Sequence, residues 1–432
     1  MFEERKIPYL DISEKLVKLS GYLFILLAII FNEFLLTKLD SHPPLNHVTV
    51  MTVRSVQVTF AIIGIILILC VWLMKKVTWI KSVFAKPMSV KILLFVLVLG
   101  VPLTVIEFGL RPVALMGKTY IFMDDEELVW KLRPNAVDNW GGTTVRINGK
   151  GYRGPEYEYA KPDGVRRILH LGDSVSFGYL LKDYNQAYPP LLEKILEEKT
   201  GDNIQTVNLS VGGYATWQEN IQLRREGYKY NSDLVILSFV LNDVTNMFSL
   251  KRFGGHSEIG HLELGFSSRD AKWFNKSGIL YLVRRVSAKF RFGKEVQKAA
   301  SQMEARKVFS LIETPDHPDV QRAWNGVFKD LQDIVDYCDS NDIDFLLVIF
   351  PFTLQFKDEE RMSIPQQTLI RYAEEHNIKY LDILNFFSIL MKKEGTIPNN
   401  YFLDYDHLNP LGNDLVAEEI ARFISDNKML DD

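Results

Sequence analysis

The stretch Ile168–Gly178, which reads ILHLGDSVSFG, decides the fold expected for this chain. Its apolar first half predicts a buried strand that ends in the turn Gly172-Asp173-Ser174, and a helical pattern begins after Gly178. Ser174 is therefore expected at the carboxyl end of a central strand and close to a helix N-terminus. There its hydroxyl can point into a crevice, and unpaired backbone N–H groups can stabilise an oxyanion. The same pattern is compatible with Ser174 being only a helix N-cap.

Short apolar runs alternate with helical patterns from this stretch to the C-terminus. This alternation predicts parallel strands joined by crossover helices. The expected fold is a three-layer α/β/α sandwich with a mainly parallel, flavodoxin-like sheet, whose active site lies beyond the carboxyl ends of the strands. The expected strands are 168–171, 206–209, 234–240, 345–350 and 379–383.

Composition narrows the classes of function. The 432 residues carry a net charge of −4, so nothing indicates nucleic-acid binding. The two cysteines, Cys70 and Cys338, lie far apart in sequence, and no disulfide framework is expected. The apolar residues, 47% of the chain, are concentrated near the N-terminus.

Three apolar runs in this N-terminal section, at about 16–36, 56–74 and 92–110, predict three transmembrane helices within a membrane anchor, residues 1–115. Each run is near the ~20 residues that cross a bilayer. The alternative is a set of buried helices in a soluble domain. Lysine and arginine are most frequent before the first run and between the second and third. The positive-inside rule then places the N-terminus in the cytoplasm and, with three spans, everything after Leu110 outside it.

Two further segments complete the domain organisation. Residues 116–165 are polar and turn-rich, with hairpin turn signals at 139–142 and 148–151, and predict a short β-rich linker. Residues 166–432 form the expected catalytic domain. Its alternation is interrupted by 248–315, a predicted helical insertion that either packs on the core or covers the strand ends as a lid or substrate wall.

Three more polar elements follow predicted strands. Gly212-Gly213 lets the backbone approach a ligand and turn an N–H toward it. Asn242 offers a neutral amide donor to an oxyanion. Asp404 precedes His407 by three residues, so its carboxylate can orient one ring nitrogen while the other points away. Taken singly, each has a simpler explanation as a turn or a surface residue.

A metal site is an alternative use of the last element. Asp404, Asp406 and His407 are all possible ligands. No second ligand cluster, HExxH motif or paired cysteine accompanies them, so we expect neither a metal nor a cofactor.

Together these elements resemble the SGNH/GDSL hydrolase family from about Arg166 to the C-terminus. GDSV matches the family's first block, with Val175 for the usual leucine; NLSVGG matches the second, LND the third and DYDH the fifth. The third block departs from the family, because Val240 stands where a glycine is usual. The resemblance implies Ser174 as nucleophile and His407 as general base and then acid. It also implies Asp404 as the residue that orients His407, and an oxyanion hole formed by the N–H groups of Ser174 and Gly213 and the Asn242 side chain.

The function expected from these features is that of a membrane-anchored serine esterase outside the cytoplasm. It would remove O-acyl groups, such as O-acetyl, from an envelope glycan or a lipid ester. One alternative is an O-acyltransferase, in which a polysaccharide hydroxyl instead of water takes the acyl group. Another is a non-catalytic membrane protein that binds glycan. The sequence leaves protein partners open.

Overall fold

The computed structural model forms two compact units. The first comprises Met1–Thr119 with Arg269–Gly293, and the second comprises Tyr120–Ser268 with Lys294–Asp432. The residues that the structure describes are 9–34, 47–96, 100, 103–104, 107–108, 121–245, 277, 279 and 308–430. Most of the predicted insertion 248–315 and much of the third apolar run lie outside the described residues.

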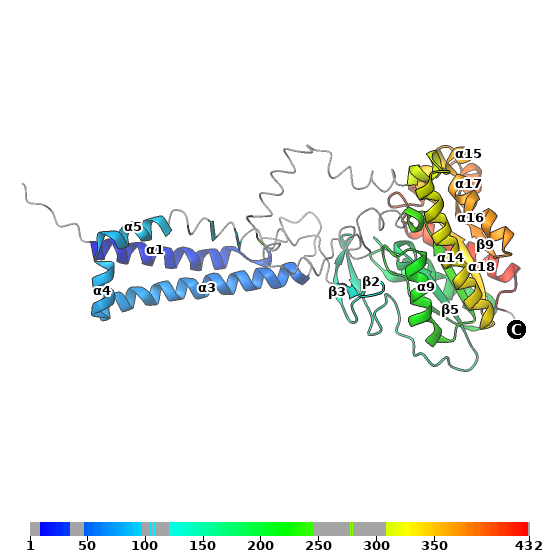
Figure 1. Cartoon of the computed structure of the whole chain (residues 1–432). Coiled ribbons are helices and arrows are strands. Elements are labelled where there is room, and N and C mark those ends of the chain that lie inside the picture. Colours follow the sequence, from blue (N-terminus) through cyan, green and yellow to red (C-terminus); the bar gives the residue numbers. More distant parts are fainter. Residues whose placement is uncertain are drawn as a thin grey trace, which may run out of the picture. The chain divides into compact units, whose positions relative to one another are not determined.

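The first unit contains an antiparallel pair of long helices (Figure 1). A Cβ atom placed on Gly64 would lie 2.9 Å from the carbonyl oxygen of Gly21, so the two backbones approach closely at these glycines. Lys75 Nζ lies 2.6 Å from Glu14 Oε1 at one end of the pair, and Arg54 Nε lies 2.5 Å from Glu33 Oε1 at the other. The helices of this unit are α1 (Tyr9–Ile30), α3 (His47–Lys76), α4 (Thr78–Phe84) and α5 (Pro87–Phe95).

One helix among the described residues is long and apolar enough to cross a membrane, where three were predicted. This is the segment Val50–Lys76 of α3, which contains the second predicted span and has a mean hydropathy of 2.7 in its most apolar window. The first predicted span lies mostly in α1, whose N-terminal half carries four charged residues between Asp11 and Lys18. These charges lower the apolar character of α1 as a whole.

The second unit begins with two small antiparallel sheets, in the segment predicted to be a β-rich linker. The turn signal at 139–142 is confirmed, since Gly141 and Gly142 have φ of 64° and 78° between two paired strands. Both sheets share an apolar cluster with Phe177, Val211 and Tyr214 of the catalytic segment. The strands are β1 (Phe122–Asp125), β2 (Val129–Leu132), β3 (Val137–Trp140) and β4 (Thr143–Arg146).

A five-stranded, fully parallel sheet forms the centre of the second unit, as the alternation predicts. Its strand order is β6-β5-β7-β8-β9, the flavodoxin-like order. The middle strand β7 has all six residues buried, because helices cover both faces of the sheet. The strands are β5 (Val165–Gly172), β6 (Asn203–Asn208), β7 (Leu234–Phe239), β8 (Asp344–Ile349) and β9 (Tyr380–Asp382).

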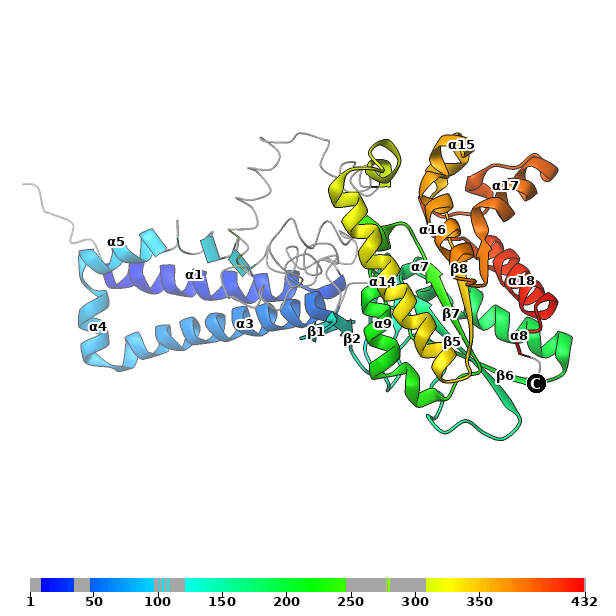
Figure 2. The same cartoon turned by 45° about the vertical axis from the view of Figure 1, so that its right-hand side comes forward.

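Helices form the outer two layers of this sandwich (Figure 2). The chain leaves β5 toward β6 in one direction and β6 toward β7 in the other, so right-handed crossovers put α8 and α9 on opposite faces. Helix α14 packs on α9, and α18 packs on α8. The helices concerned are α8 (Tyr188–Thr200), α9 (Thr216–Arg225), α14 (Pro318–Ser340), α16 (Ile364–Glu375), α17 (Ile383–Glu394) and α18 (Pro410–Asp426).

Candidate active site

Ser174 is the first residue of the short helix α7 (Ser174–Phe177), directly beyond the carboxyl end of β5. Asp173 caps this helix, because its Oδ1 accepts a hydrogen bond of 2.9 Å from the N–H of Val175. The helix ends after one turn at Gly178, whose φ of 76° is left-handed. The short turn therefore fixes Ser174 at a helix N-terminus, with its side chain half-buried.

His407 lies in a tight loop that leads into α18. The loop is closed by an isolated antiparallel bridge between Phe402 and Leu408. Asn409 caps α18, with its Oδ1 accepting from the N–H of Gly412 at 2.9 Å, as the Asn-Pro sequence predicts. The imidazole is thereby held between a closed loop and the start of a long helix, and only 5% of His407 is exposed.

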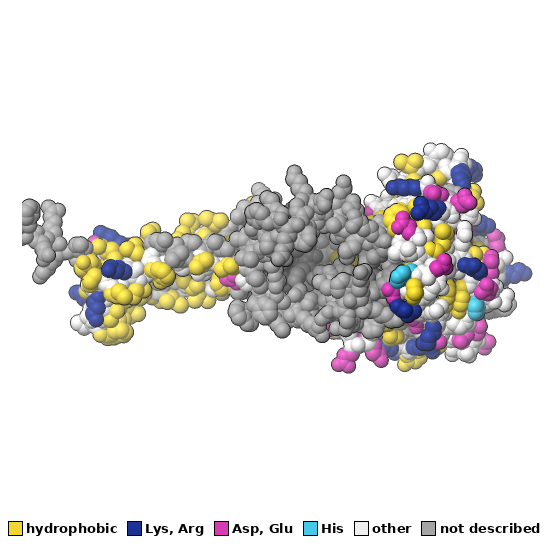
Figure 3. All heavy atoms as spheres, turned by 45° about the horizontal axis from the view of Figure 1, so that its top comes forward, with side chains coloured by type: hydrophobic (Ala, Val, Ile, Leu, Met, Phe, Trp, Pro, Cys, Tyr) yellow, Lys and Arg dark blue, Asp and Glu magenta, His cyan; other side chains and the backbone are white. Residues whose placement is uncertain are grey.

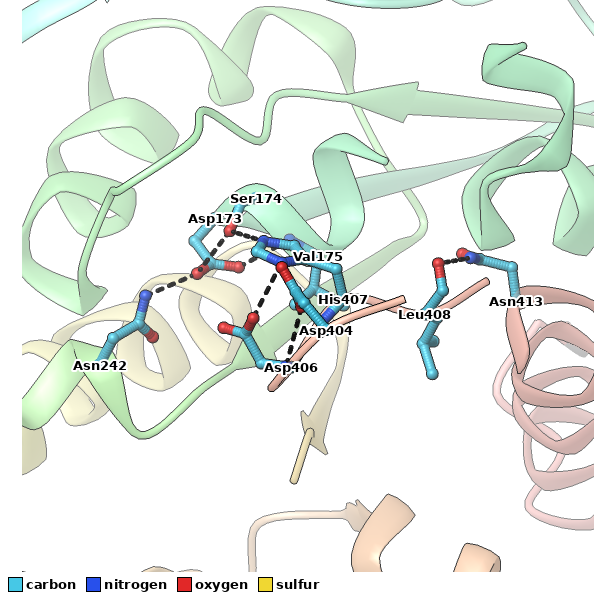
Figure 4. Close-up of polar contacts among 9 residues, drawn as sticks. All are labelled: Asp173, Ser174, Val175, Asn242, Asp404, Asp406, His407, Leu408 and Asn413. Atoms are coloured by element: carbon cyan, nitrogen blue, oxygen red, sulfur yellow. Dashed lines mark hydrogen bonds and ion pairs between the residues drawn. The ribbon is translucent and has the colours of Figure 1, made fainter. Parts of the chain in front are cut away.

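The side chains of Ser174, His407 and Asp404 meet at the carboxyl edge of the sheet (Figure 4). Ser174 Oγ lies 2.9 Å from His407 Nε2. On the other side of the ring, Nδ1 lies 2.9 Å from Oδ1 and 2.8 Å from Oδ2 of Asp404. Asp404 Oδ1 also accepts from the backbone N–H of His407 at 2.9 Å, which keeps the carboxylate in place. This arrangement can move a proton from the hydroxyl to the imidazole while the carboxylate fixes the tautomer.

The electrostatics of the site are dominated by a histidine facing two carboxylates. Burial lowers the pKa of His407, but the carboxylates of Asp406 and Asp404 outweigh this effect and raise the pKa well above its usual value. Burial also pushes the pKa of Asp404 upward, but its hydrogen bond and charge interaction with His407 leave that pKa below its usual value. Burial raises the pKa of Asp406 to about 6 against the attraction of His407.

The N–H groups of Ser174 and Gly213 are the two backbone donors expected for an oxyanion. Gly213 has a left-handed φ of 80°, and a Cβ on its neighbour Gly212 would collide with the indole of Trp140. The glycine pair is thus explained by one backbone angle and one close contact. Among the described residues, neither the N–H of Ser174 nor that of Gly213 has a hydrogen-bond partner.

Asn242 is the first residue of a helical segment that follows β7, close to the same edge of the sheet. Its Nδ2 donates a hydrogen bond of 2.8 Å to Oδ2 of Asp173. The same Asp173 oxygen lies 3.3 Å from Ser174 Oγ. A primary amide carries two hydrogens, so this bond leaves one for an oxyanion. Asp173 therefore connects the helix that carries Ser174 to the helical segment that begins at Asn242.

Three side chains that support the site carried no recognisable signal in the sequence. Arg153, 4% exposed, donates to the carbonyls of Phe177, Gly178 and Leu181 at 3.2, 2.6 and 3.0 Å, and so holds the chain that follows Ser174. Tyr179 packs on the imidazole of His407 with ring centres 4.8 Å apart. Trp140 in turn packs on Tyr179 at 4.4 Å.

Asp404, Asp406 and His407 are also the described residues whose possible ligand atoms lie close enough for one metal ion, all within 4.8 Å of one another. A cation at Nδ1 would displace its proton and leave the remaining proton on Nε2. His407 could then no longer accept a proton from Ser174. The 2.9 Å contact between Nε2 and Ser174 Oγ fits the proton-transfer arrangement.

The family model of the GDSL-like lipase/acylhydrolase family matches residues 170–415, more than half of the chain. The chain belongs to this family. It is accordingly an ester-hydrolysing enzyme, as the sequence predicts. The match covers most of the sheet and all three side chains that meet at its edge.

The comparison with solved structures found several similar chains. A variant of Axe2, an acetyl xylan esterase from Geobacillus stearothermophilus, is 14% identical, with 60% of this chain and 94% of that chain covered and a TM-score of 0.38. LAE5, an alpha/beta hydrolase enzyme from the metagenome of Lake Arreo in Spain, is 15% identical, with 63% and 99% covered and a TM-score of 0.38. No curated protein matches the chain in sequence. The functional argument rests on family membership and on the geometry of the site.

Proposed function

We propose that this GDSL-family enzyme cleaves O-acyl esters through an acyl-enzyme on Ser174. The observation that carries the proposal is the unbroken line of contacts from Ser174 Oγ to His407 Nε2, 2.9 Å, and from Nδ1 to Asp404, 2.8 Å. His407 takes the hydroxyl proton as Oγ attacks the acyl carbon, and the carbonyl electrons move onto oxygen. The tetrahedral intermediate then collapses, the ester C–O bond breaks, and His407 returns the proton to the leaving alcohol.

The oxyanion hole in this proposal consists of the N–H groups of Ser174 and Gly213 and the side chain of Asn242. All three donors are neutral, so they stabilise the developing charge without a change in protonation. Asp173 keeps the Asn242 amide oriented through their 2.8 Å hydrogen bond. Water then attacks the acyl-enzyme, with His407 as base, and releases the acid.

We further propose that the first unit anchors the enzyme in a membrane through three spans. Only 22% of the most apolar window of α3 is buried within the structure, which is unlike the core helix of a soluble domain. Ile66 and Trp72 of this helix are both 58% exposed. In Figure 3, hydrophobic side chains make up most of the described surface of this unit, with Lys and Arg side chains at one end. Contact with lipid tails would remove these exposed apolar side chains from water.

The charges of this unit support an orientation. Because α1 and α3 are antiparallel, the lysines at the start of α1 and at the end of α3 lie at one end of the pair. The positive-inside rule assigns this end to the cytoplasm. The third predicted span, 92–110, which begins within α5, would then carry the catalytic unit outside the cytoplasm.

The proposed substrates are O-acyl esters, such as O-acetyl groups, on an envelope glycan, with lipid esters as the next class. A membrane-anchored active site outside the cytoplasm would be accessible to both the glycan esters and the lipid esters. An O-acyltransferase would use the same acyl-enzyme, and the difference lies only in whether water or a sugar hydroxyl reaches it. The family membership favours hydrolysis.

Hydrolysis of 4-nitrophenyl acetate by the full chain in detergent micelles tests the proposed nucleophile and base. Ser174→Ala and His407→Ala are each expected to abolish turnover, and Ser174→Ala is expected to abolish labelling by a fluorophosphonate probe. Ser388→Ala removes another buried serine, in α17, and should retain activity and labelling. Turnover near the wild-type rate in either active-site variant would refute the assignment. Acylated sugar formed when an acetylated donor and a glycan acceptor are supplied together would indicate transfer instead of hydrolysis.

A further inference from the structure

A second carboxylate faces His407 from the residue just before it. Asp406 Oδ1 lies 2.9 Å from His407 Nδ1, the nitrogen to which Asp404 is also bound. Asp406 is 2% exposed, and no described residue makes a hydrogen bond of good geometry to its Oδ1. A buried carboxylate oxygen without a donor is costly, so this position calls for an explanation.

The local backbone holds Asp406 in this position. Its N–H donates to Asp404 Oδ1 at 3.2 Å, and the loop around it is closed by the bridge between Phe402 and Leu408. The closed loop therefore holds the backbone of Asp406 where its side chain faces the ring, and no described residue donates a hydrogen bond to its Oδ1.

The charged groups around Asp406 decide which positive charge it can balance. Within the described residues, no lysine or arginine forms an ion pair with Asp406. The other ionisable groups that face this cluster are Asp173 at the start of α7, Asp404 in the same loop and Tyr179 against the ring. Tyr405 lies edge-on to His407, with the two ring centres 6.0 Å apart. His407 is thus the group whose positive charge Asp406 can balance.

We propose that Asp406 is a second positioning residue, which stabilises the imidazolium of His407 while Asp404 fixes its tautomer. The inference rests on the function proposed above. When the Oγ–H bond of Ser174 breaks and Nε2 takes the proton, the ring gains a positive charge that extends to Nδ1. A negative oxygen already 2.9 Å away, on a buried side chain, stabilises that charge without having to move. Asp406 is the strongest of the groups that raise the pKa of His407 against the lowering effect of burial, which agrees with this role.

The pH dependence of kcat/KM for 4-nitrophenyl acetate tests the role, with the full chain in detergent micelles. His407 must be neutral to act as a base, so the rate rises as the pH passes the pKa of this residue. Asp406→Asn removes the negative charge at nearly constant shape and lowers that pKa. The rising limb should move to lower pH by about one unit or more, the size expected of an opposite charge in close contact. The plateau rate should fall about tenfold, because a weaker base assists the attack less.

Asp382→Asn is the matched control. Asp382 is a partly buried carboxylate at the start of α17, where it accepts from the N–H of Leu384 at 3.0 Å. Asparagine preserves that cap, so this variant should keep the wild-type pH profile. If Asp406→Asn does not fold, as judged by its circular-dichroism melting curve, Asp406→Ser removes the same charge and is subject to the same test.

The outcomes separate this inference from the proposed function. A rising limb of the pH profile that moves to lower pH in Asp406→Asn and does not move in Asp382→Asn supports the role of Asp406. If the rising limb of the Asp406→Asn pH profile coincides with that of the wild type while Ser174→Ala is inactive, the role of Asp406 is overturned and the nucleophile assignment stands. An active Ser174→Ala overturns both.

Discussion

The contact between Trp140 and Gly212 gives a sharp test of the oxyanion loop, by which we mean the Gly212-Gly213 segment that carries one proposed oxyanion donor. Gly212 precedes the proposed donor Gly213, and the indole of Trp140 lies directly against it. A methyl group at this position, as in Gly212→Ala, would overlap Trp140 Cη2 and lie 3.0 Å from both Cζ2 and Cζ3. The indole has little room to retreat, because its ring packs against Phe122, Phe177 and Tyr179.

The size of the effect follows from the displacement. To restore ordinary contact, the loop has to move by more than 1 Å. A misplacement of about 1 Å at a reacting centre already costs about 10²-fold in rate. We therefore expect Gly212→Ala to lower kcat by about 10² through the displaced N–H of Gly213. Most of the loss should be in kcat, because the donor acts on the charge that develops in the transition state.

Steady-state kinetics with 4-nitrophenyl acetate measures the loss, and a compensating variant identifies its cause. Trp140→Phe removes the benzo ring that carries the three clashing atoms, so Gly212→Ala combined with Trp140→Phe should recover part of the lost rate. The matched reference is Trp140→Phe alone, which corrects for the packing lost around the indole. A kcat for Gly212→Ala within about threefold of wild type would refute the rigid contact on which the reasoning depends.

Two further predictions concern the oxyanion hole and the membrane. Asn242→Ala is expected to lower kcat by about 10²–10³, as the loss of an oxyanion donor does elsewhere. Asn242→Asp also loses the amide hydrogens and should be equally impaired. An unchanged kcat in the alanine variant would show that Asn242 is not part of the oxyanion hole. Ser340→Cys places an exposed thiol at the end of α14, next to Cys338, which is itself buried and therefore a poor target. A membrane-impermeant maleimide should label it in intact cells, and labelling that requires lysis would reverse the proposed orientation.

The main elements of the site could be predicted because they follow strands. In a parallel sheet, the carboxyl ends of all strands lie at one edge, so residues that directly follow them are brought together wherever they are in the chain. Ser174 after β5 and Asn242 after β7 are placed by this rule alone. His407 needed one more local signal, the Asn-Pro pair that starts α18.

The membrane section was less predictable from hydropathy. The charges of α1 leave α3 as the helix among the described residues with the length and composition of a span. An apolar run marks the segment that avoids water, but the helix that contains it extends into charged flanking sequence.

Local sequence thus determined the parallel sheet, its flavodoxin-like type and the residues at its edge. The reason is that strand periodicity, helix periodicity and turn chemistry are properties of neighbouring residues. Only the tertiary structure decided that Trp140 packs against Gly212, that Arg153 holds the chain that follows Ser174, and that Asp406 faces the ring of His407. The first two contacts join segments far apart in the chain, and the third depends on how a closed loop directs a side chain. Packing and side-chain direction of this kind have no periodic signature, so they are fixed only when the chain folds.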